Sequence, residues 1–155
     1  MSGKLVVGVV GVVVGVVGVV FAYLELAMPA NYWPYDNPSS LTMTSPQDGY
    51  RFSDDFLVEL SGSLSTSDRI WLAAKDADQS WYPLTEAMVA SKDHWKATIR
   101  AEQVISPVEL CAVKVGENGA NEFRSFLQTG DPEQGLATLP SGGESLVCRN
   151  ILPAA

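Results

Sequence analysis

The sequence predicts an all-β fold: an antiparallel β-sandwich of about seven strands with one short helix, preceded by a single N-terminal transmembrane helix. Two observations support this prediction. Residues 5–24 are twenty positions without a charge, almost all Val and Gly. From residue 41 onward, apolar and polar residues alternate in short segments separated by turn residues, which is typical of half-buried strands.

The N-terminal apolar segment is long enough to cross a bilayer as a helix. At about 1.5 Å per residue, such a segment extends roughly 30 Å, the thickness of the hydrocarbon core. We therefore expect a short N-terminus over residues 1–4 and a transmembrane helix over residues 5–26. A cleaved signal peptide is the alternative. The run is longer than the usual apolar region of about 7–15 residues in signal peptides, and it is not followed by a good small-x-small cleavage site.

Small residues follow one stripe of the predicted transmembrane helix. Spacings of three and four residues place them on a single face: Gly8, Gly11, Gly15, Gly18 and Ala22. Gly11 and Gly15 form a GxxxG pair, which lets two helix backbones approach closely. The stripe predicts packing against another transmembrane helix, from a second copy or from a partner subunit. The alternative is compositional, because a tract of Val and Gly often produces these spacings.

Charge predicts the orientation of the chain in the bilayer. Lys4 precedes the apolar run and the next basic residue is Arg51, so the positive-inside tendency places the N-terminus in the cytoplasm. Residues 27–40 contain prolines and several aromatic residues, which predicts a stiff juxtamembrane linker with an interfacial aromatic belt. The expected location is the cell membrane, single-pass, with an extracytoplasmic domain over residues 41–152 and a tail over residues 153–155.

Periodicity predicts the elements of this domain in order. Residues 41–46 form a short strand that ends at a proline and is followed by a Gln-Asp-Gly turn. Alternating apolar residues predict five further strands, over residues 56–61, 70–75, 81–84, 95–100 and 108–115. The strand over residues 81–84 contains Pro83, which indicates a sheet edge. Residues 121–128 have helical character, and residues 145–151 form the last strand. We expect Trp71 and Trp95 to fill the core between the two sheets.

Several of these segments resemble a bacterial Ig-like sandwich module. Residues 41–49 and the segment Val-Glu-Leu-Ser-Gly-Ser-Leu at 58–64 are similar to its opening pattern of a strand, a proline, a turn glycine and V-x-L-x-G. Residues 70–76, 81–83 and 94–99 resemble its middle strands. Such modules mostly serve as spacers, adhesive units or binding surfaces. The resemblance therefore implies an Ig-like scaffold and no chemistry.

The two cysteines, Cys111 and Cys148, fall on the sixth and seventh predicted strands, which are neighbours in such a sandwich. We expect a disulfide between them if the domain lies in an oxidising compartment, and two buried thiols are the alternative. Antibody-type domains carry their cysteines on the second and sixth strands, so this chain departs from that pattern.

The composition argues against catalysis, metal binding and nucleic-acid binding. Ten basic and eighteen acidic residues give a net charge of −8, which disfavours nucleic acid as a partner. His94 is the only histidine, and no nucleophile motif accompanies it. The cysteines lack zinc-ligand spacing, and Asp76 and Asp78 lack the pattern of a calcium loop. We therefore expect no catalytic residues, no metal and no cofactor.

Trp81 and Tyr82 are the remaining candidates for ligand binding. They lie on the predicted edge strand, where aromatic rings can stack on a sugar or anchor a protein partner. Packing of the two rings under a loop is the alternative. The sequence predicts a non-catalytic, membrane-anchored extracytoplasmic interaction or accessory subunit that assembles through its glycine-lined helix. The rival prediction is a cell-wall or glycan-binding module that uses Trp81 and Tyr82.

Overall fold

The computed structural model describes residues 39–131 and 133–154 of the chain. The predicted transmembrane helix, its glycine stripe and nearly all of the predicted linker lie outside the described residues. Within the described part, no helix combines the length and the hydrophobicity needed to cross a bilayer.

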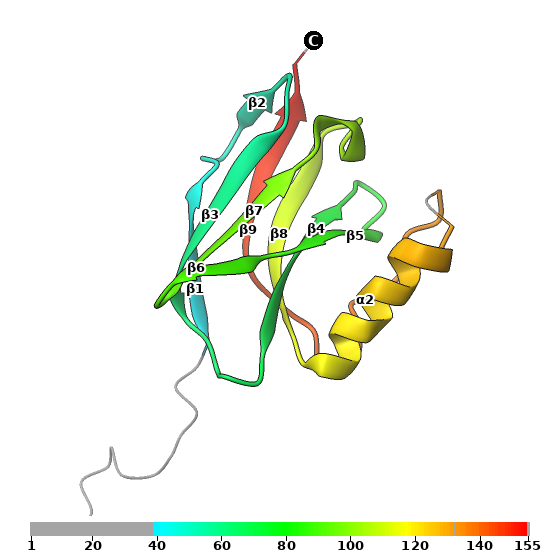
Figure 1. Ribbon diagram of the computed structural model, residues 1–155. Coiled ribbons are helices and arrows are strands. Elements are labelled where there is room, and N and C mark those ends of the chain that lie inside the picture. The colour runs from blue at the N-terminus through cyan, green and yellow to red at the C-terminus, as the bar shows by residue number, and fades with distance from the viewer. Residues whose placement is uncertain (1–38, 132, 155) are drawn as a thin grey trace, which may run out of the picture. The chain divides into compact units, whose positions relative to one another are not determined.

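Nine strands, one α-helix and one short 3-10 helix form the described part of the chain (Figure 1). The strands are β1 (Ser40–Ser45), β2 (Tyr50–Phe52), β3 (Phe56–Ser63), β4 (Arg69–Lys75), β5 (Trp81–Glu86), β6 (Met88–Ser91), β7 (His94–Ile99), β8 (Val108–Val115) and β9 (Glu144–Pro153). The helices are η2 (Ala101–Gln103) and α2 (Glu117–Thr129). One sheet has the order β1-β3-β7-β6 and the other β2-β9-β8-β4-β5.

The predicted two-sheet, mostly β fold with one helix is confirmed, and three details of the prediction are wrong. Strands β2 and β6 were not predicted, so the described residues hold nine strands and not about seven. Strand β2 pairs with β9 in parallel, so the five-stranded sheet is mixed and not antiparallel. The helix begins at Glu117, four residues before the predicted start.

The core between the sheets is built from the inward positions of alternating strands. Every second residue is buried along β7 and over Phe56–Leu60 of β3, as the sequence period predicts. The buried side chains include Met43, Phe56, Leu60, Leu72, Trp95 and Leu110. The prediction for Trp95 is therefore confirmed, since its ring packs between the two sheets.

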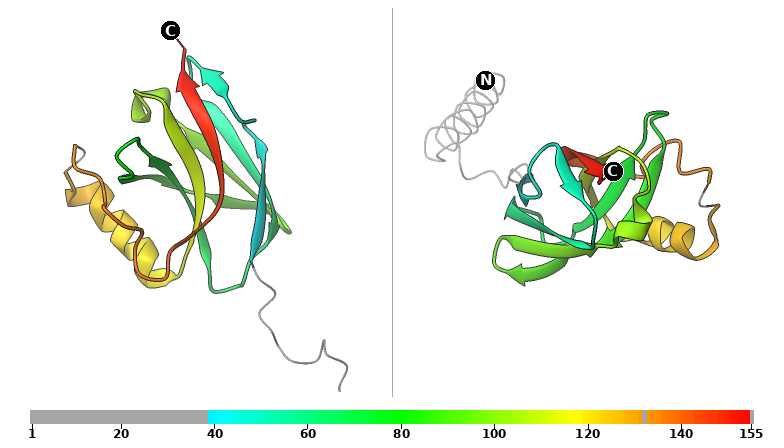
Figure 2. Two further views of the ribbon diagram at one scale, coloured as in Figure 1. Left: turned by 180° about the vertical axis from the view of Figure 1, so that it is seen from behind. Right: turned by 90° about the horizontal axis from the view of Figure 1, so that it is seen from above.

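A second hydrophobic cluster lies on the outer face of the five-stranded sheet. Helix α2 covers this face over β4, β5 and β8 (Figure 1 and Figure 2). Phe123 of α2 packs on Trp71 of β4, with their ring centroids 5.3 Å apart. The prediction that Trp71 fills the core between the sheets is wrong, because alternation along β4 directs Trp71 outward and Ile70 and Leu72 inward.

Four charged side chains link α2 to the same sheet. Arg69 of β4 donates to Glu86 of β5 at 2.9 Å and to Glu117 of α2 at 2.7 Å. Arg124 of α2 donates to the same two carboxylates, at 3.0 Å and 3.3 Å. We call these four residues the Arg–Glu ring, because each arginine bonds both glutamates. The hydrogen bonds from Arg69 and then Arg124 lower the pKa of Glu117.

Candidate functional site

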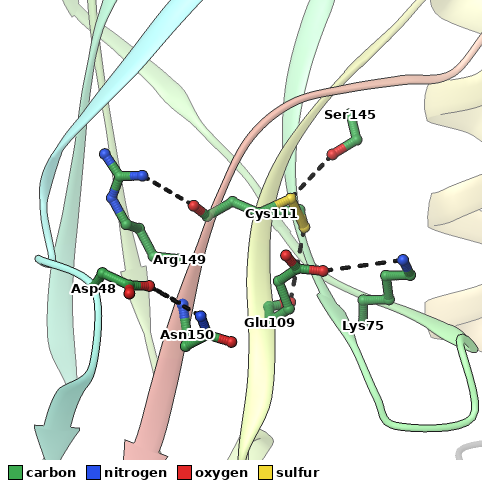
Figure 3. Close-up of a disulfide and its surroundings, with 8 residues drawn as sticks. Asp48, Lys75, Glu109, Cys111, Ser145, Arg149 and Asn150 are labelled. Carbon is green, nitrogen blue, oxygen red and sulfur yellow. Dashed lines mark hydrogen bonds and ion pairs between the residues drawn. A yellow bond between two sulfur atoms is a disulfide. The ribbon is translucent and has the colours of Figure 1, made fainter.

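Cys111 and Cys148 form a disulfide that joins β8 to β9 (Figure 3). The two residues lie directly opposite each other in the strand register. Cys111 is fully buried in the cluster beneath α2, and Ser145 Oγ lies 3.1 Å from Cys148 Sγ. Glu109 is close enough to complete a metal-ligating group with the two sulfurs, but both sulfurs are committed to the disulfide. The geometry of this cluster is that of a structural cross-link.

The start of the domain is tied to β9 near the disulfide. Asp48 accepts hydrogen bonds from the backbone nitrogen of Asn150 at 2.8 Å and from its side-chain nitrogen at 3.1 Å (Figure 3). The backbone bond first, and the side-chain bond next, lower the pKa of Asp48. This contact holds the turn between β1 and β2 against the last strand.

Trp81 and Tyr82 belong to different clusters. They are neighbours on β5, so their side chains point to opposite faces of the sheet. Trp81 packs with the cluster beneath α2 and exchanges two 2.8 Å backbone hydrogen bonds with Leu136. The Nζ of Lys75 lies 5.4 Å from the centroid of the Trp81 ring. Tyr82 packs against the core between the sheets. The structure therefore does not bring the two predicted ligand-binding rings onto one surface.

Tyr82 lines a cavity at one end of the sandwich, which we call the Tyr82 cavity. It lies between the β4–β5 hairpin and the connection from β7 to β8 that contains η2, and its volume is about 280 Å³. Apolar and polar side chains share its walls: Ala74, Asp76, Tyr82, Glu102, Gln103, Val104, Ile105, Ser106 and Val108. Ile105 is 88% exposed, so it stands at the rim.

Tyr82 is held in this cavity from two sides. A glycine, Gly135, approaches so closely that a Cβ there would lie 2.7 Å from Tyr82 Cζ. Asp76 lies close enough to the phenol for its charge to act on the hydroxyl, and it accepts a hydrogen bond from the Ser80 backbone at 2.9 Å. Burial first, and the charge of Asp76 next, raise the pKa of Tyr82 above its ordinary value of 10.0. The ring is therefore a fixed wall, and its hydroxyl keeps its proton at physiological pH.

Two basic residues close in sequence to the cavity wall, Lys75 and Arg100, each pair with a glutamate, and the partner of Arg100 lines the cavity. Lys75 Nζ lies 4.0 Å from a carboxylate oxygen of Glu109, and Arg100 lies 3.6 Å from one of Glu102. Neither Lys75 nor Arg100 lines the cavity. Asp76 accordingly contributes a negative charge to the cavity wall without a basic partner among the described ion pairs.

The sequence identified Tyr82 but missed most of its surroundings. The sequence suggests Asp76 only as a calcium ligand; among the described residues it lines the cavity with Tyr82 and belongs to no group of three or more metal-ligating side chains. Ile105 lies in a connection without periodicity. Apart from being an apolar residue close to Pro107, it has no feature in the sequence that indicates a site. His94 is exposed on β7, where its Nδ1 bonds the Lys92 carbonyl at 2.9 Å.

Comparison with protein-family models and with curated proteins gives no match for this chain.

Proposed function

We propose that this chain is a non-catalytic, membrane-anchored interaction or accessory subunit whose extracytoplasmic domain binds a partner protein. The Tyr82 cavity is the observation that carries the proposal, because it combines an aromatic wall, a carboxylate and an exposed isoleucine at its rim. An apolar concavity with a few placed polar groups is typical of a binding site.

The membrane location rests on the predicted helix over residues 5–26, of which residues 5–24 are twenty positions without a charge, long enough to cross a bilayer. The disulfide between Cys111 and Cys148 supports an extracytoplasmic domain, because disulfides persist mainly in oxidising compartments. The short N-terminus is then cytoplasmic, and the lipid bilayer and a second transmembrane helix are the partners of the anchor.

The scaffold proposed for the domain is Ig-like. In the Ig convention the order β1-β3-β7-β6 corresponds to strands A, B, E and D, and β9-β8-β4 to strands G, F and C. Strand β5 occupies the place of C′ beside β4. Two features set this chain apart from antibody domains: α2 lies between the F and G equivalents, and the disulfide joins those same two strands.

A protein partner is better supported than a glycan. Sugar rings are usually held by exposed aromatic faces, and the separation of Trp81 and Tyr82 onto opposite faces of β5 leaves no platform made of both rings. The exposed side chain of Ile105 beside the cavity suits the apolar contacts of a protein interface.

Site-specific photo-crosslinking in cells tests the proposal. A photoreactive residue replaces Ile105 at the cavity rim of the full chain, or Leu57 on the outer face of the four-stranded sheet as the matched control. Both positions are exposed, at 88% and 44%. We expect a discrete protein adduct at position 105 that is absent at position 57 and decreases with Tyr82→Ala.

Three results would contradict the proposal. Equal adducts at positions 105 and 57, or none at 105, would remove the cavity as a protein-binding site. An adduct at position 105 that soluble cell-wall glycan abolishes, and that Trp81→Ala also removes, would favour the glycan-binding alternative.

A further inference from the structure

Carboxylates line the Tyr82 cavity, and Glu102 is paired with Arg100 at 3.6 Å whereas Asp76 has no basic partner among the described ion pairs. Asp76 and Glu102 line it, and Asp78 and Asp131 lie close enough to act electrostatically on the Tyr82 hydroxyl. Of the described residues that line the cavity, none is basic. A cation that enters is therefore attracted to the wall, whereas an anion is repelled.

The shape of the cavity suits one side chain better than a whole small molecule. Its volume of about 280 Å³ is at the lower limit of small-molecule sites, which usually range over roughly 300–1,000 Å³. Ala74, Val104 and Val108 contribute apolar side chains to the same lining as Asp76. Lysine and arginine side chains combine an apolar stem with a charged head, so they match both parts of this surface.

We infer that the Tyr82 cavity binds a lysine or arginine side chain of the partner protein, with its charged head beside Asp76 and the Tyr82 ring and its methylene stem along the apolar side chains of the lining. Carboxylates bond such heads with charge-assisted hydrogen bonds, and aromatic rings attract cations. This inference rests on the proposed binding function and names the chemistry that its site selects.

The isoleucines of the chain provide a specific probe of the cavity. The sequence contains four of them, and Ile105 is 88% exposed whereas Ile70, Ile99 and Ile151 are at most 1% exposed. In the full chain in non-ionic micelles, labelled with ¹³C at the isoleucine δ1 methyl groups, the Ile105 signal reports binding. The three buried signals serve as internal references, and Ile105→Val assigns the reporter.

The titration uses three small probes: the Nα-acetyl methylamides of lysine, arginine and norleucine. Norleucine has the apolar stem of lysine without the charge. We expect the lysine and arginine probes to shift the Ile105 methyl signal in a saturable manner, and the norleucine probe to bind about tenfold more weakly, as loss of one charge-assisted hydrogen bond implies.

Two variants test the assigned contacts. Asp76→Asn removes a negative charge from the cavity wall and is expected to weaken binding of the lysine probe about tenfold. Asp54→Asn is the matched control, because it removes the same charge from an exposed residue outside the Tyr82 cavity. We expect Asp54→Asn to leave the affinity within about twofold, since screened surface charges contribute little.

The inference is overturned if the norleucine probe shifts Ile105 as strongly as the lysine probe, if Asp54→Asn weakens binding as much as Asp76→Asn, or if no probe shifts Ile105. These results leave the photo-crosslinking experiment intact. An adduct at position 105 with no preference for cationic probes would retain the binding function and reject the chemistry assigned to the cavity.

Discussion

Tyr82 depends on a glycine for the space that its ring occupies. Gly135 has a φ of +56°, which a residue with a Cβ adopts only with strain. A methyl group there would also meet the phenol ring of Tyr82 and the Cβ of Ser80. Two independent constraints therefore act at this one residue, and together they fix the wall of the cavity.

Alanine substitutions at Gly135 and at Gly142 separate the backbone constraint from the contact with Tyr82. Gly135→Ala is expected to destabilise the protein by more than the roughly 1–2 kcal/mol that a left-handed backbone costs a non-glycine residue, because the methyl also displaces Tyr82. Gly142→Ala is the control, since its φ is +72° and no heavy atom of the described residues lies within 4 Å of its Cβ. Urea denaturation measures both variants. Equal losses would show that contact with Tyr82 adds nothing.

The phenol of Tyr82 predicts a pH dependence at alkaline pH. Burial and the Asp76 charge raise the pKa of Tyr82 above 10.0, so the folded state holds this proton more tightly than the unfolded chain does. The resulting stabilisation is present below pH 10 and is lost as the pH rises through the folded pKa. In an absorbance titration at alkaline pH, the tyrosinate signal that Tyr82→Phe removes should appear above pH 10. Asp76→Asn should shift this signal only partly toward lower pH, because burial is the larger cause.

Trp71 shows what the sequence predicted at the scale of one residue and what it did not. Alternation correctly placed Trp95 in the core between the sheets, but Trp71 lies in a run of five apolar residues, Ile-Trp-Leu-Ala-Ala, that does not alternate. Such a run is typical of a strand buried on both faces, as β4 is. The second cluster was therefore visible in the sequence, although the element that covers it was not.

At the scale of elements, β2 and β6 explain why the prediction gave too few strands. Strand β6 is an edge strand with all four residues exposed, so no buried face produces an alternating pattern. Strand β2 has three residues and pairs in parallel with β9, a contact between segments about 100 positions apart. Short and exposed elements of this kind are defined by their partners and not by local sequence.

The Arg–Glu ring predicts a local effect on α2. Glu86 accepts from both arginines, so Glu86→Gln should weaken the attachment of α2 and increase hydrogen exchange of its amides several-fold, with little change in β3 and β7. Glu59→Gln is the control, because it removes a single ion pair with Lys96 on the other sheet. Salt should reduce the difference in α2 hydrogen exchange between the two variants, because it screens the ion pairs. If hydrogen-exchange protection of the α2 amides were unchanged in Glu86→Gln, the attachment of α2 would be assigned to Phe123 and not to the Arg–Glu ring.

The disulfide encloses α2 in a loop, because its cysteines are 37 residues apart and flank the helix. In the chain-entropy model, closing such a loop stabilises the folded state by about 4 kcal/mol. Replacing both cysteines by alanine should lower the free energy of unfolding by roughly this amount, as urea denaturation measures. Wild-type protein under reducing conditions should show a similar loss. Unchanged stability of both would contradict the role assigned to the cross-link.

The domain as a whole has three layers: the four-stranded sheet, the five-stranded sheet and α2. The helix and the segment after it cover the outer face of β4 and β8, so both faces of these two strands are buried. The Tyr82 cavity opens instead at one end of the sandwich, between a hairpin and a connection. Connections carry little periodic signal, and for this reason the two-sheet fold could be predicted from the sequence and most of the cavity could not.

For the full chain, the glycine stripe predicts assembly through the proposed transmembrane helix. Bulky substitutions at its centre, Gly11→Ile and Gly15→Ile, should prevent close approach of two helix backbones and reduce chemical crosslinking in membranes. Val13→Ile and Val17→Ile are the matched controls, since they add bulk off the stripe. Formation of the Cys111–Cys148 disulfide in each variant reports whether the domain still folds. Unchanged crosslinking in the glycine variants would reject assembly through the stripe. The Tyr82 cavity would then be the remaining proposed interaction site, and photo-crosslinking at position 105 would be its test.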